Sequence, residues 1–132
     1  MEAADCFDAA ERNLSDARRY LEIGQAVNWV PDRLQSAVLW AMDGWLLARN
    51  FEVNRGLGWG ATQQAFYKAA PPELYAKVSH CYSKALSLQY QLEGGFDHEE
   101  PIPPMDVWLE SAFKCLEESE IAVDLLTQDG FE

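Results

Sequence analysis

Apolar and small residues recur every three or four positions along most of the chain, which is the spacing of one face of an α-helix. In the first segment this face is formed by Ala3, Phe7, Ala10, Leu14, Ala17 and Leu21. Gly24 follows these residues, and glycine commonly ends a helix. The pattern therefore predicts a helix over about residues 3–24.

The second segment, residues 33–50, is apolar on almost every side from Ala37 to Ala48. A helix with no polar face packs in the interior, so this one is predicted to be the most buried. Pro31 and Asp32 precede it, and an aspartate in this position predicts an N-cap.

Two tryptophans on this second helix, Trp40 and Trp45, are five positions apart. At about 100° per residue they point about 140° from each other. We expect one of them to face the core and the other to face a dimer partner or a pocket; burial of both in the core is the alternative.

The next part of the chain is broken by glycine and proline. Three glycines in residues 51–60 predict a bend, and a short helix over about 61–69 is predicted to stop before Pro71 and Pro72. If a small ligand binds anywhere, the polar residues Asn54 and Arg55 in this bend are the candidates.

Two long helices complete the pattern. One is predicted over about residues 72–93, ended by Gly94-Gly95, and the other over about 105–128, with Gly130 at its C-cap. The sequence thus predicts an all-α fold in one domain, residues 1–132. Its architecture is a four-helix up-down-up-down bundle with a short extra helix between the second and third long helices.

Charge is distributed unevenly in this acidic chain, whose formal net charge is −12. Residues 1–96 carry 11 acidic and nine basic residues, whereas residues 97–132 carry 11 acidic residues and one base, Lys114. An anionic C-terminal third repels phosphate backbones, so nucleic-acid binding through it is disfavoured. It is either a solvated helix face or a docking surface for a basic protein.

The remaining composition fits a cytoplasmic protein that needs no cofactor. The acidic N-terminus resembles neither a signal peptide nor a transit peptide, and no apolar run is long enough to span a membrane. Three cysteines without paired spacing are expected to be reduced, buried thiols. The adjacent pair His80 and Cys81 lacks a third orienting residue, and consecutive ligands such as Asp97 to Glu100 rarely converge on a metal ion, so we predict neither thiol catalysis nor a metal site.

Four patterns in the chain resemble the HEPN superfamily of helical nucleotide-binding domains. They are the end of the first helix (Ala17 to Gly24), the small and apolar second helix (Leu34 to Leu47), a third helix that opens at Pro72-Glu73-Leu74 and contains Cys81 to Lys84 and Tyr90, and an amphipathic closing helix over about 105–127. Together they cover roughly nine-tenths of the chain.

The resemblance implies a specific site on the third helix. Ribonucleases of this superfamily carry an arginine there, followed after four to six residues by a histidine that acts in acid/base chemistry. In this sequence the matching positions hold Lys84 and Tyr90. Lysine can hold a phosphate as a point charge, whereas tyrosine, with a pKa near 10, is a poor proton shuttle at neutral pH.

The ribonuclease motif is therefore absent, and the resemblance implies a non-catalytic, dimeric binding module. Its partner would be a small nucleotidyltransferase or another component of a toxin–antitoxin or defence system. Lys84, Tyr90, Arg55 and Asn54 are the predicted ligand-binding residues, and Trp40 and Trp45 the predicted interface residues. Two alternatives stay open: a ribonuclease or nucleotide-handling enzyme with an altered motif, and an acidic inhibitor that imitates nucleic acid to block a basic protein.

Overall fold

The computed structural model describes residues 2–53, 55–95 and 97–131, with the backbone alone at Arg55 and Phe131. These described residues form five α-helices and two single-turn 3-10 helices: α1 (Ala3–Ile23), η1 (Val27–Trp29), α2 (Val30–Ala48), η2 (Arg55–Leu57), α3 (Trp59–Ala69), α4 (Pro72–Leu92) and α5 (Met105–Phe131). No strand occurs in these described residues. The all-α prediction, with four long helices and one short helix between the second and the third, is confirmed.

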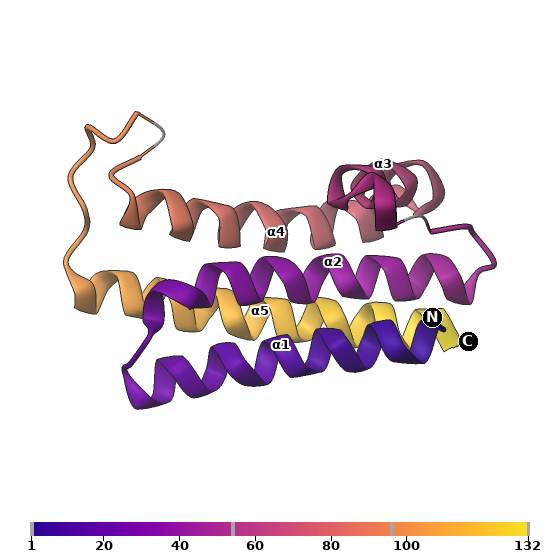
Figure 1. Ribbon diagram of the computed structural model, residues 1–132, viewed down its shortest axis with the longest axis horizontal. Coiled ribbons are helices and arrows are strands. Elements are labelled where there is room, and N and C mark those ends of the chain that lie inside the picture. The colour runs from indigo at the N-terminus through magenta and orange to yellow at the C-terminus, as the bar shows by residue number, and fades with distance from the viewer. Residues whose placement is uncertain (1, 54, 96, 132) are drawn as a thin grey trace.

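The four long helices form an up-down-up-down bundle (Figure 1). Consecutive long helices run in opposite directions, so the two ends of the chain lie at the same end of the bundle, and α3 lies where α2 ends and α4 begins. α2 packs against α1, α3, α4 and α5, while α5 packs against α1, α2 and α4. The helices α1 and α4 therefore lie on opposite sides of the α2–α5 pair.

α2 is the innermost helix, as its pattern predicts. Every residue from Ala37 to Leu46 is buried except the half-buried Trp40. Gly44 lies so close to Phe7 of α1 that an added Cβ atom would come within 2.9 Å of the phenyl ring. A small residue at this position is what lets α1 and α2 approach each other.

The start of α2 differs from the prediction. The helix begins at Val30, with Trp29 as N-cap, so Pro31 lies inside the first turn and Asp32 is not the N-cap. Proline fits there because its missing N–H would have had no partner within the helix. Asp32 still stabilises this end, since a carboxylate in the first turn opposes the positive pole of the helix dipole.

The end of α5 also differs. Gly130 was predicted as a C-cap, but the helix continues through it to Phe131. Gly130 packs on the same phenyl ring as Gly44: a Cβ atom added to it would lie 3.2 Å from Phe7 Cζ. Phe7 thus lies against glycines of two helices, and packing explains this glycine better than chain reversal does.

Hydrogen bonds of two buried tryptophans connect α5 to its neighbours. Trp45 Nε1 donates to Asp129 Oδ2 at 2.7 Å, and Trp108 Nε1 donates to the Leu88 carbonyl of α4 at 3.0 Å.

Within the described residues, no helix is both long enough and apolar enough to cross a membrane.

Candidate binding groove

A groove runs between the antiparallel helices α4 and α5, and each helix lines it with one stripe of side chains. The stripe of α4 consists of Lys77, His80, Lys84, Ser87 and Gln91, and that of α5 of Ser111, Lys114, Glu118, Ile121, Leu125 and Gln128. Both follow alternating steps of three and four residues, which keep side chains on one face of a helix. Two adjoining cavities of about 480 and 460 Å³ share His80 and make up this α4/α5 groove.

The first cavity, which we name the lysine half, contains Lys84 of α4 and Lys114 of α5. The other residues that line it are His80, Ser83, Ser87, Leu88, Gln91, Ser111 and Cys115. Both lysines are exposed, and neither forms an ion pair with a described residue. The residues that line this cavity include two lysines and no aspartate or glutamate, in a chain of net charge −12.

The second cavity, which we name the apolar half, presents more apolar than polar surface. Its aliphatic residues are Ile121, Ala122 and Leu125 of α5, and the other lining residues are Lys77, His80, Cys81, Glu118, Asp124 and Gln128. The Ile121 side chain is 70% exposed. Exposure of a large aliphatic side chain to water is unfavourable, and a ligand that covered it would lower the free energy.

His80 and Glu118 face each other where the two halves meet. His80 Nε2 lies 4.0 Å from Glu118 Oε2, and the backbone carbonyl of Glu118 accepts a hydrogen bond from Cys81 Sγ at 3.5 Å. Burial raises the pKa of both Cys81 and Cys115 to about 11. These thiols therefore stay protonated at neutral pH, which disfavours nucleophilic chemistry by sulfur.

Two of the predicted ligand-binding residues, Lys84 and Tyr90, lie on different sides of α4. Lys84 lies in the groove, but Tyr90 is six residues further along α4, about 240° around the helix, and lines neither cavity. Tyr90 is half-buried, and its backbone carbonyl accepts a hydrogen bond from Gly95 N at 2.7 Å. Asn54 lies outside the described residues, and so does the side chain of Arg55.

The two predicted interface tryptophans occupy different environments. Trp45 is 1% exposed and lies in the core, so within this fold it offers no surface to a second molecule. Trp40 is half-buried and meets Trp59 of α3 edge to face, with ring centroids 5.4 Å apart. The rings of Trp40 and Trp59 line a cavity of about 290 Å³ together with Gly58 and Thr62.

A buried carboxylate lies beside that cavity. Asp43 is fully buried in the apolar helix α2, and its Oδ1 accepts a hydrogen bond from Thr62 Oγ1 of α3 at 2.7 Å. A neighbouring cavity of about 320 Å³ reaches both residues. Sequence reasoning did not select Asp43, although a lone charge between Arg33 and Arg49 in an apolar run was a visible signal.

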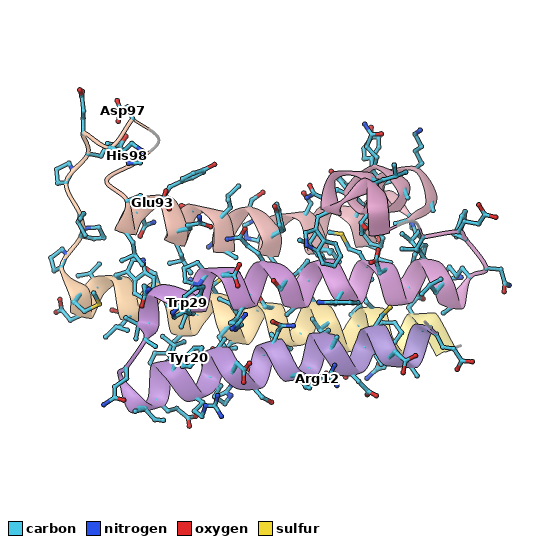
Figure 2. All side chains as sticks on the ribbon, in the orientation of Figure 1. Arg12, Tyr20, Trp29, Glu93, Asp97 and His98 are labelled. Carbon is cyan, nitrogen blue, oxygen red and sulfur yellow. The ribbon has the colours of Figure 1, made fainter. Side chains whose placement is uncertain are left out.

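The acidic loop after α4 is organised by its own backbone. His98 lies back toward the end of α4, with Nδ1 2.9 Å from the Glu93 carbonyl oxygen, and Asp97 lies farther out (Figure 2). In the part of the chain that the structure describes, no three His, Cys, Asp or Glu side chains are grouped so that they could hold a metal ion.

Sequence reasoning missed Lys114 and His80 as groove residues. In the sequence, Lys114 stands out as the one base among the acids of residues 97–132, and His80 as the neighbour of Cys81. The signal was the polar stripe on each helix, but a polar stripe alone does not reveal that two such stripes face each other.

Comparisons with known proteins do not indicate a function for this chain. No protein-family model matches this sequence, and neither the comparison with curated proteins nor that with solved structures gave a match.

Proposed function

We propose that this protein is a non-catalytic binding module of HEPN-like architecture that engages a partner protein through the α4/α5 groove. The observation that carries the proposal is the combination of two exposed lysines without ion pairs and a 70% exposed isoleucine in one groove. Such lysines and such an isoleucine contribute little to the stability of the fold. A complementary surface of a partner would form ion pairs with the lysines and remove the isoleucine from water, and both changes favour binding.

The resemblance supplies the class of partner. The sequence resembles the HEPN superfamily, and in that resemblance Lys84 matches the arginine of the motif. On that basis the proposed partner is a small nucleotidyltransferase or another component of a defence system, and the module acts as a homodimer.

The test is affinity capture of the tagged protein with mass spectrometry of bound proteins. The decisive variant is Lys84→Glu, which reverses one charge in the groove, and the matched control is Lys68→Glu, at an exposed lysine in the last turn of α3. We expect Lys84→Glu to lose the partner and Lys68→Glu to retain it. Equal retention by both variants would refute a role for the groove.

One observation favours an enzyme as the second candidate. His80, with Glu118 at 4.0 Å, shares the groove with Lys84, and these are a proton-transfer group, an orienting carboxylate and a phosphate-holding cation. An RNA cleavage assay tests this candidate with the variants His80→Ala and Lys84→Ala, and Tyr90→Phe, which lies outside the groove, is the control. Cleavage that purified protein catalyses, that the two groove variants lose and that Tyr90→Phe retains would overturn the non-catalytic proposal.

A further inference from the structure

Resting on the proposed function, we infer that the α4/α5 groove binds a single amphipathic helix of the partner. In this arrangement acidic side chains of the partner helix lie over Lys84 and Lys114, and aliphatic side chains lie over Ile121 and Leu125. The inference goes beyond the proposed function because it specifies the secondary structure, the charge and the orientation of what is bound.

The length of the groove fits a short helix. From Lys77 to Gln91, α4 lines it over 14 residue steps, which correspond to about 21 Å at the α-helical rise. A partner helix of about 14–16 residues has that length. A channel between two antiparallel helices is also a surface into which the side-chain ridge of a third helix packs.

The lysine half selects for acidic side chains. Lys84 and Lys114 come from opposite walls, so a carboxylate between them can be approached from both sides. The hydroxyl groups of Ser83, Ser87 and Ser111 supply further hydrogen-bond donors to the same space. Because no described carboxylate pairs with either lysine, a carboxylate that binds to them breaks no ion pair of these lysines.

The apolar half favours a helix over a free phosphate or an RNA strand. A free phosphate would satisfy the lysine half but leave Ile121 and Leu125 in water. An RNA strand would place phosphates beside Glu118 and Asp124, which line the apolar half, on a chain of net charge −12. A helix with acids toward one end and aliphatic residues toward the other covers both halves.

The experiment is a selection from a display library of random 16-residue peptides on the immobilised full-length protein. We expect the recovered peptides to carry two or more acidic residues toward one end and aliphatic residues three or four positions apart toward the other. Circular dichroism of the bound peptide should show helix formation.

Matched variants then test where the peptides bind. Lys84→Glu and Ile121→Asp should each weaken peptide binding at least tenfold in fluorescence anisotropy. The controls Lys68→Glu and Ile23→Asp make the same changes at exposed positions outside the groove and should leave the affinity unchanged. A peptide whose acids are replaced by lysines should recover binding to the double variant Lys84→Glu/Lys114→Glu, a charge exchange that a merely destabilised variant would not show.

Other results would overturn the inference. They are selected peptides without acids, equal binding to groove and control variants, saturable groove binding of inorganic phosphate or single-stranded RNA with no peptide recovered, and self-association that Ile121→Asp abolishes. Failure of the proposed function is a different result. If no peptide binds but captured partners are still lost in Lys84→Glu, the groove remains the binding surface and only the helical occupant is wrong.

Discussion

The two sides of α5 carry charge in opposite arrangements. Toward α1 and α2, its acids meet arginines: Arg18 pairs with Glu120, and Arg49 pairs with Asp129 at 2.5 Å while its guanidinium lies 4.5 Å from the centre of the Trp45 ring. Toward α4, the exposed lysines of the groove pair with no described carboxylate. We call these the arginine side and the lysine side of α5.

This difference separates groups that hold the bundle together from groups that are available to a ligand. Arginine, with its planar fork of donors, suits fixed pairing with a carboxylate, whereas lysine is a flexible point charge. Two of the acids in residues 97–132, Glu120 and Asp129, are thus matched by arginines from the first half of the chain.

The largest expected effect comes from removing Trp45, which joins the arginine side to the core. Its ring meets the Phe66 ring edge to face, with the ring centroids 5.3 Å apart, and its Nε1 donates a hydrogen bond to Asp129. Trp45→Ala should lower the free energy of unfolding by about 3–5 kcal/mol, measured by urea unfolding with circular dichroism. Trp45→Phe, which keeps a ring but loses the hydrogen bond, is a milder variant should the first fail to fold.

The control for this prediction is Trp29→Ala. Trp29 is 52% exposed at the corner between α1 and α2, and its loss should change the stability by about 0.5 kcal/mol or less. Equal losses at the two tryptophans would show that Trp45 does not have the structural role given to it.

Two glycines should respond to alanine in opposite directions. Gly44→Ala forces the Phe7 ring to move from a position 2.9 Å from the new Cβ, which should cost about 1–3 kcal/mol. Gly60 lies within α3 and has open space around it, so Gly60→Ala should stabilise the protein by about 0.5–1 kcal/mol. Thermal unfolding of the two variants checks both signs, and a stable Gly44→Ala protein would mean that α1 and α2 pack less closely than described.

A direct test compares one arginine with one lysine. Arg49→Ala removes an ion pair and a cation–π contact and should cost about 1 kcal/mol, because both interactions are partly exposed. Lys84→Ala should leave the stability within about 0.5 kcal/mol while it weakens partner capture. If Lys84→Ala destabilises the fold as much as Arg49→Ala does, the lysine side is structural and the comparison fails.

The sequence could predict most of the fold because hydrophobic spacing is a local property. The stripe from Ala3 to Leu21 and the all-round apolar run after Ala37 lie on helices where the pattern places them. The errors came from residues with two uses. Pro31 can precede a helix or occupy its first turn, and in the structure it lies in the first turn. Gly130 can end a helix or make room for a ring, and its packing on Phe7 shows that the second use applies.

The candidate site was harder to predict because it depends on which helices are neighbours. Lys84 was selected through a resemblance to a motif, but its partners in the groove come from α5, some 30 positions away in the sequence. Tyr90 was selected by the same motif, yet helical geometry places it on another side of α4. A spacing rule within one helix cannot supply the facing wall of a groove.

The smallest expected effects are those of pH on two carboxylates of the arginine side. Hydrogen bonds from Trp45 and Arg49 lower the pKa of Asp129 below its ordinary 3.8, so its charge stabilises the fold above that pH and this contribution disappears as the pH falls through the folded value. Burial, together with repulsion from Asp124, Glu120 and Asp8, raises the pKa of Glu11 above its ordinary 4.5.

The two shifts have opposite consequences for stability. The folded protein holds the proton of Glu11 more tightly than the unfolded chain does, so Glu11 destabilises the fold once the pH has risen through its folded pKa. At neutral pH, Glu11→Gln should therefore raise the free energy of unfolding and Asp129→Asn should lower it, each by less than about 1 kcal/mol because solvent screens both groups. Urea unfolding at a series of pH values should show the effect of Glu11→Gln vanish below its ordinary pKa, and that of Asp129→Asn only at lower pH still. Loss of stability in both variants at neutral pH would mean that Glu11 has a favourable partner and that acids on this side of α5 are matched more completely than the arginine pairs indicate.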